Sequence, residues 1–249
     1  MIENGMELMN LKIANIVPVG NLNETKDSSI HMCLAHVARN NESYAQFYRK
    51  VAETSYVVLD NGEAEGNQLT FEELHEVMSY INPSEVVIPD SLYDKNSTIS
   101  KMKDFTSFLK TKCWKYKGKL MAVPQGYDGS EYVECAKILA DQGCIHTLGI
   151  SKFMIQKEVN RRTFISHLLF SEGIQKEIHV LGLNSLDELR DLKDLDNSIR
   201  SLDTCYAALY AQNKKRIDSD VPCRSRTFMF AYKAGSKLLS ENIAKLYKI

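Results

Sequence analysis

The feature that most constrains the fold of this chain is a regular alternation between two kinds of segment. Short runs rich in Val, Ile and Leu, each followed by Gly, Pro, Asp or Asn, are typical of buried β-strands. Such runs occupy residues 12–20, 55–62, 84–90, 119–126, 145–150, 177–183 and 198–203, and a weaker eighth run occupies residues 227–232.

Helical patterns lie between these runs. In residues 70–81 the apolar side chains share one helix face, and Thr70 followed by Glu73 predicts a capping box at the start of the helix. Further helices are expected at 130–143 and 185–195, and two more within 27–52, with a break near 40–43.

Strand and helix therefore alternate without a long linker, and this order predicts a parallel sheet flanked by helices. Seven or eight strand–helix units in 249 residues match the size of a (β/α)8 TIM barrel. We expect a single TIM-barrel domain over residues 1–249. A doubly wound open sheet is the alternative, but it often carries a glycine-rich phosphate loop after its first strand. The segment "PVGNLNET" (18–25) is not such a loop.

Composition argues against several classes of site. The net charge is −1, from 31 basic and 32 acidic residues, so any surface that binds nucleic acid must be local. The six cysteines and six histidines show no metal-ligand spacing, and we predict no metal site. Scattered cysteines, the lack of a signal-peptide pattern and the lack of an apolar run of about 18 residues predict a cytoplasmic protein away from membranes.

Polar residues follow four of the predicted strands: Asp60 with Asn61, Asp90, Gln125, and Asp203 with Thr204. An aspartate after a strand is more often a helix cap or turn residue, but capping does not require several of them to converge. In a TIM barrel the carboxyl ends of all strands meet at one rim, where active sites lie. Two carboxylates across one pocket are typical of exchange or hydrolysis at a glycosidic carbon. Asp90 and Gln125 would then read the edge of a base.

Five motifs occur in order at these strand ends. They are "VVLDNGEAEG", "VVIPD", "AVPQG", "TLGIS" and "RSLDTCYAALYAQNK". Together they resemble the tRNA-guanine transglycosylase superfamily, and more closely its short phage-type branch, the DNA-guanine transglycosylases that insert 7-deazaguanines into DNA. The likeness spans residues 12–213.

The resemblance implies a role for each residue. Asp203 would attack C1′ of the target nucleoside and carry the covalent sugar intermediate, and Asp60 would serve as the general acid/base. The implied substrate-binding residues are Asp90, Gln125, Gly126, Leu148, Gly149 and Asn61. No cofactor is implied. The implied partners are DNA and a free 7-deazaguanine base, either 7-cyano-7-deazaguanine or a relative.

The chain also departs from the tRNA enzymes of that superfamily. Those enzymes carry a Cys-x-Cys-x-x-Cys…His zinc site near the C-terminus, whereas Cys223 stands alone here. The segment between Asp203 and the last helix is short, and "DNGEAEG" replaces a glycine pair. We therefore expect a barrel without the zinc subdomain, and DNA rather than tRNA as the polymer. If the gene is a phage's, the compartment would be the host cytoplasm.

A basic run follows the predicted nucleophile. Its members are Lys214, Lys215, Arg216, Arg224 and Arg226, and we expect them on the rim against phosphates, with a solvated loop as the alternative. Arg161 and Arg162 are expected on a plain helix face. The alternative functions are a tRNA-guanine transglycosylase-like enzyme, a non-catalytic barrel that binds nucleobase or nucleic acid, and an unrelated barrel enzyme with a small substrate. No oligomeric state is predicted.

Overall fold

A computed structural model describes residues 11–113, 115–153, 160–183, 185–192, 195, 198–217 and 230–249. Within these residues, eight parallel strands form one sheet in the order β1-β8-β7-β6-β5-β4-β3-β2. The strands are β1 (Lys12–Asn15), β2 (Ile30–Leu34), β3 (Tyr56–Asp60), β4 (Glu85–Val87), β5 (Lys119–Ala122), β6 (Thr147–Ser151), β7 (Glu177–Leu181) and β8 (Ser201–Thr204).

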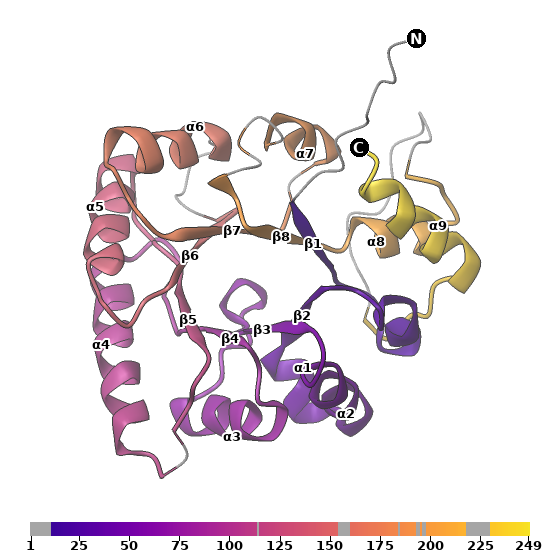
Figure 1. The fold of residues 1–249 in the computed structure, drawn as a ribbon, viewed down its shortest axis with the longest axis horizontal. Helices are drawn as coiled ribbons and strands as arrows, with labels where there is room; N and C mark the ends of the chain where they lie inside the picture. Colours follow the sequence, from indigo (N-terminus) through magenta and orange to yellow (C-terminus); the bar gives the residue numbers. More distant parts are fainter. Residues whose placement is uncertain are drawn as a thin grey trace.

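The sheet nearly closes on itself. Strands β1 and β2 are the two ends of the hydrogen-bonded order, and they lie beside each other. Figure 1 shows the strands as a ring with the helices around its outside. This arrangement confirms the predicted (β/α)8 TIM barrel and excludes the doubly wound open sheet.

The helices of the described residues surround this ring. They are α1 (Ala35–Asn40), α2 (Glu42–Val51), α3 (Phe71–Ile81), α4 (Lys95–Thr111), α5 (Gly129–Ala140), α6 (Arg161–Ser166), α7 (Leu186–Leu192), α8 (Tyr206–Gln212) and α9 (Ser236–Leu246), with the 3₁₀ helices η1 (Val19–Thr25) and η2 (Glu63–Glu65) and the π-helical segment η3 (His167–Ser171). The predicted capping box is present at α3, where Thr70 Oγ1 accepts from the Glu73 N–H at 3.2 Å and Glu73 Oε2 accepts from the Thr70 N–H at 3.0 Å. None of the described helices is both long and apolar enough to cross a bilayer.

The structure differs from the sequence-based prediction at strand β2 and at the weak strand 227–232. Residues 27–52 do hold two helices, α1 and α2, which break at Asn41, but Ile30–Leu34 form strand β2. All five residues of β2 are buried, so the run has no alternating pattern to separate a strand from a buried helix. Of the predicted weak strand 227–232, residues 227–229 lie outside the described part, and 230–232 are not a strand.

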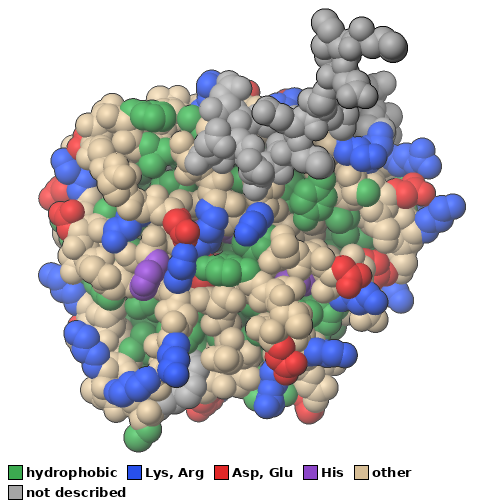
Figure 2. Space-filling view, viewed as in Figure 1, with side chains coloured by type: hydrophobic (Ala, Val, Ile, Leu, Met, Phe, Trp, Pro, Cys, Tyr) green, Lys and Arg blue, Asp and Glu red, His purple; other side chains and the backbone are tan. Residues whose placement is uncertain are grey.

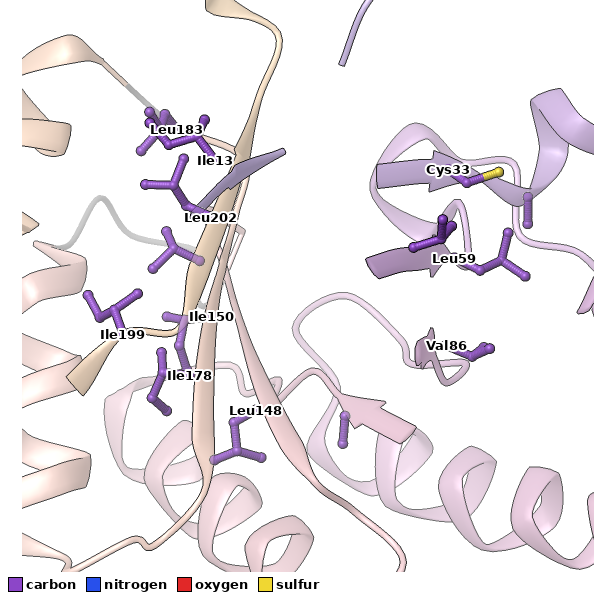
Figure 3. Close-up of a cluster of buried hydrophobic side chains, with 14 of the residues drawn as sticks. Ile13, Cys33, Leu59, Val86, Leu148, Ile150, Ile178, Leu183, Ile199 and Leu202 are labelled. Atoms are coloured by element: carbon purple, nitrogen blue, oxygen red, sulfur yellow. The ribbon is translucent and has the colours of Figure 1, made fainter. Parts of the chain in front are cut away.

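The two faces of the strands carry different side chains, as the period of two in a β-strand requires. The outward set packs beneath the helices and includes Ile13, Cys33, Leu59, Val86, Leu148, Ile150, Ile178 and Leu202 (Figure 3). The inward set fills the barrel and includes Ala14, Met32, Val58, Val87, Met121 and Val123. Asp60 lies two residues after the inward Val58, so its side chain also faces the barrel interior.

The amino-terminal end of the barrel is closed by a network of charged side chains. The Arg200 guanidinium lies 2.7 Å from Glu85 Oε2 and 3.0 Å from Glu177 Oε2, and Lys119 Nζ lies 2.7 Å from the same Glu177 oxygen. Glu85 is fully buried, and Thr147 Oγ1 donates to its second oxygen at 2.5 Å. Because buried charges are tolerated only when they are paired and hydrogen-bonded, this network is a structural plug at the end opposite the site.

Candidate active site at the carboxyl end of the barrel

A cavity of about 310 Å³ opens at the carboxyl ends of the strands. Four of the predicted site residues line it: Asp60, Asn61, Asp90 and Asp203. Apolar side chains from six other places in the chain form much of its wall: Ile16, Met32, Leu34, Val87, Val123 and Leu181. The barrel therefore brings the predicted carboxylates to one mouth, as the rule for parallel strands predicts.

Asp203, at the end of β8, is 5% exposed. One carboxylate oxygen, Oδ1, accepts from the Gly182 N–H at 2.9 Å and lies 3.3 Å from His179 Nε2. Within the described residues, no hydrogen bond is made to the other oxygen, Oδ2. The side chain is thus anchored through one oxygen and leaves the second available for a reaction.

The turn that supplies the Gly182 N–H is itself held by Arg161 of α6. The guanidinium donates to the carbonyls of Gly182 at 2.6 Å and Leu181 at 2.8 Å, and it pairs with Glu188 at 2.6 Å. Arg161 is 1% exposed. The expectation of a plain helix face is therefore wrong for Arg161, because its buried guanidinium binds the backbone carbonyls beside Asp203 and the Glu188 carboxylate.

Asp60, at the end of β3, faces the same cavity. Its Oδ2 accepts from the Gly62 N–H at 2.9 Å. Gly62 has a φ of 81°, and a Cβ there would lie 2.8 Å from the Asn67 carbonyl oxygen, so this turn requires glycine. Burial, followed by the negative charge of Glu65, raises the pKa of Asp60 well above its ordinary value, against the opposing Gly62 hydrogen bond; Asp203 and Asp90 add to the rise. Asp60 therefore holds its proton to higher pH than an ordinary aspartate.

Asp90 is held between two amides. Asn61 Nδ2 donates to Oδ1 and Gln125 Nε2 donates to Oδ2, each at 2.7 Å, and Asp90 is 2% exposed. Burial raises the pKa of Asp90 to about 6, although the hydrogen bonds from the two amides oppose the rise. At neutral pH it remains an ionised acceptor with a fixed orientation.

The side-chain amides of Asn61 and Gln125 each make further hydrogen bonds within the protein. Asn61 Nδ2 also donates to the Ile88 carbonyl at 2.8 Å, and its Oδ1 accepts from the Glu63 N–H at 2.9 Å. Gln125 is fully buried and its Oε1 accepts from the Tyr93 N–H at 3.2 Å. Gln125 does not line the cavity, so in this structure its contact is with Asp90.

The other three residues predicted to bind substrate also lie behind the cavity wall. Leu148 faces outward into the core beneath the helices (Figure 3). Gly149 faces the barrel interior, where a Cβ would lie 2.8 Å from Leu181 Cδ1. Gly126 allows the loop after β5 to approach α5, since a Cβ would lie 2.4 Å from the Tyr132 nitrogen. The two glycines shape the space around the site rather than its surface.

The cavity carries an excess of acid. Among the described residues that line it, Lys152 is the cation, and five are acidic: Asp60, Glu63, Glu65, Asp90 and Asp203. Glu63 and Glu65 come from the segment "DNGEAEG", and the sequence pattern alone does not assign either glutamate to the site. Burial, then the charge of Asp203, raises the pKa of Glu65. Such a cavity favours a ligand rich in N–H donors and disfavours a phosphate inside it.

The described part of the predicted phosphate-binding segment, Lys214 to Arg216, does not contribute to this cavity. Lys214, Lys215 and Arg216 follow α8 and do not line it. At 1.5 Å per residue, α8 carries the chain about 10 Å from the end of β8. Arg216 pairs with Glu241 of α9 at 3.3 Å, whereas Cys223, Arg224 and Arg226 lie outside the described residues. Figure 2 shows Lys and Arg side chains spread over the described part of one face, with acidic side chains between them.

In the described ranges, no group of three or more His, Cys, Asp or Glu side chains is arranged to hold a metal ion. A scan against known protein families and a search of curated proteins both find no match for this chain.

Proposed function

We propose that this protein is a base-exchange transglycosylase that replaces guanine in a polynucleotide with a 7-deazaguanine through a covalent aspartyl–sugar intermediate. The observation that carries the proposal is the meeting of Asp60 and Asp203 in one cavity, with one carboxyl group anchored and the other biased toward its protonated form. The five strand-end motifs that resemble the superfamily support the same reaction.

In the first step, Asp203 Oδ2 attacks C1′ of the target nucleotide and forms an ester-like O–C1′ bond as the C1′–N9 bond breaks. The electron pair of the broken bond goes to N9, which takes the proton of Asp60 as guanine leaves. In the second step, the incoming base gives its N9 proton to the Asp60 carboxylate, and N9 attacks C1′. Asp203 is released, and Asp60 is protonated again. Atoms and charge balance without an oxidant, a metal or a cofactor.

Asp90 is the proposed reader of the base. Guanine and 7-deazaguanines present adjacent N1–H and exocyclic amine donors, and an ionised carboxylate accepts from both. Each Asp90 oxygen already takes one amide donor, from Asn61 or Gln125, and retains acceptor capacity for the base. The two amides would therefore act by orienting Asp90 rather than by touching the base.

The polymer is proposed to be DNA. The acid-rich cavity would admit a base and sugar and keep phosphates outside it, so the backbone would contact basic residues beyond the cavity. Whether the segment Lys214–Arg226 supplies them stays a prediction. The tRNA substrate and the non-catalytic binding barrel remain the competing functions, and one assay separates them.

The assay follows radiolabelled guanine into duplex DNA, single-stranded DNA and tRNA side by side, with Asp203→Asn as the blank. We expect the label to enter DNA, and then to be displaced by a 7-deazaguanine such as the 7-cyano or 7-aminomethyl base. Entry of the label into tRNA alone would support the base-exchange reaction but contradict the proposal that DNA is its substrate. Binding of the free base without entry into any polymer would support the non-catalytic barrel.

Asp90→Ala is expected to weaken binding of a free 7-deazaguanine about 10- to 100-fold, because the base donors would then be buried without a charged acceptor. Isothermal titration calorimetry measures the effect, with Asp104→Ala on the exposed side of α4 as the matched control. Asp90→Ala also leaves the Asn61 and Gln125 amides without the acceptor that they now share. Thermal unfolding of both variants must therefore be recorded. An unchanged base affinity in a folded Asp90→Ala protein would contradict the assigned role.

A further inference from the structure

A continuous chain of hydrogen bonds runs through the barrel beneath Asp203. Arg200 Nε donates to Ser201 Oγ at 3.1 Å, Ser201 Oγ lies 2.7 Å from His179 Nδ1, and His179 Nε2 lies 3.3 Å from Asp203 Oδ1. His179 and Ser201 are fully buried, and the pairing of β7 with β8 sets them opposite each other. The chain therefore links the charged network at the amino-terminal end to the cavity at the other.

The types of group at each link give this chain a direction. An ionised Asp203 only accepts, so His179 Nε2 must carry the hydrogen between them. In a neutral imidazole Nδ1 then has only a lone pair, and the Ser201 hydroxyl donates to it. Arg200 has no acceptor, so the Ser201 oxygen accepts from it. Every donor in the chain thus points toward Asp203.

Arg200, the end of this hydrogen-bond chain that lies farthest from Asp203, is fixed in place. Arg200 is clamped between Glu85 and Glu177, whose carboxylates lie 2.7 Å and 3.0 Å from the guanidinium. The neighbouring inward positions of the barrel hold apolar side chains such as Val58, Val87 and Met121. A histidine and a serine in this layer cost desolvation that apolar residues would avoid, which makes a purely space-filling role a poor account of them.

We propose that His179, held by Ser201, is a positioning residue for Asp203. It fixes Oδ1 together with the Gly182 N–H, so that Oδ2 is presented to C1′ in one orientation. The inference rests on the proposed function, because it takes Asp203 to be the nucleophile. His179 itself touches neither the sugar nor the base.

The first test reads the hydrogen-bond chain directly and needs no activity. Nitrogen-15 NMR of ring-labelled histidine in the whole protein is expected to show His179 with its proton on Nε2 and a bare Nδ1. Ser201→Ala should disturb the Nδ1 resonance, and Asp203→Ala should disturb the Nε2–H resonance. A proton on Nδ1 alone would overturn the inference. So would an Nε2–H resonance that does not change in Asp203→Ala.

The second test reads the consequence for exchange. His179→Leu is expected to lower kcat about 10- to 100-fold, the usual value of a lost hydrogen bond to a charged group, with little change in KM for the free base. His179→Gln, whose amide N–H can reach the place of Nε2, should recover most of the rate. His31→Leu is the matched control, since His31 is also buried, at 2% exposed, but lies on β2, which does not pair with β7, and packs against Phe47 and Tyr48 of α2.

The outcomes are separable. Equal losses in His179→Leu and His179→Gln, or a change confined to KM, would show that His179 only supports the structure and would overturn the inference. A wild-type protein without exchange into any polymer would refute the proposed function instead. In that event the NMR measurement alone decides whether His179 is fixed on Asp203.

Discussion

Asp203→Asn is expected to abolish base exchange, with a loss of at least about 10⁴-fold, because an amide cannot form the covalent sugar intermediate. Asparagine keeps the shape of the side chain, and its carbonyl oxygen can still accept from the Gly182 N–H that now binds Oδ1. The fold should therefore be retained. Denaturing gels of enzyme mixed with end-labelled DNA give the most direct measurement: a covalent band should form with the wild type and be missing from the variant.

Two comparisons make this result specific. Asp104→Asn changes an exposed carboxylate of α4 and should leave both the band and the rate unchanged. Asp203→Ala should lose the band as fully as Asp203→Asn does. Exchange by Asp203→Asn at a rate near that of the wild type would remove Asp203 from the role of nucleophile, and with it the proposed reaction.

Asp60→Asn is expected to slow exchange by about 10²- to 10⁴-fold, the usual contribution of a general acid or base. In the proposed mechanism Asp60 donates its proton to the leaving base, and the pKa of Asp60 is raised by burial and by the charge of Glu65. The wild-type rate of guanine departure should therefore fall as pH rises through that raised pKa, because the protonated form is lost. The variant has no proton to lose at this position, and its rate should show no such fall. Single-turnover release of labelled guanine across the pH range measures both.

The same substitution should stabilise the fold at neutral pH. Since the pKa of Asp60 in the folded protein lies above the unfolded value of about 4, the native chain holds a proton that the unfolded chain has released. The free energy of unfolding of the wild type therefore falls as pH rises through this interval, and Asp60→Asn escapes that cost. Chemical denaturation at pH 4 and pH 8 tests this: the advantage of the variant should be larger at pH 8. If Asp60→Asn slows exchange and is also less stable than the wild type at pH 8, the loss of rate would be due to damage to the structure instead.

The architecture and the convergence of the carboxylates follow from the pattern of the sequence. Alternating strand and helix patterns require a parallel sheet, and parallel strands bring their carboxyl ends to one edge whatever their separation along the chain. Asp60, Asp90 and Asp203 could therefore be assigned to one mouth from their positions after apolar runs. Local capping was equally readable, because Thr70 and Glu73 interact within a single turn of α3.

The partners that surround these residues depend on how the strands and helices pack in the folded barrel. Strand β2 is recognisable only by its pairing with β3, since five buried residues in a row show no period. His179 meets Ser201 and Asp203 through the register of β7 on β8, and nothing in its sequence neighbourhood marks it. Gln125 was predicted to contact the base, yet the fold places its amide against Asp90 and the Tyr93 N–H. Side-chain contacts across strands depend on register and on which face each residue takes, and these are set by the packing of the whole barrel rather than by any short stretch of the chain.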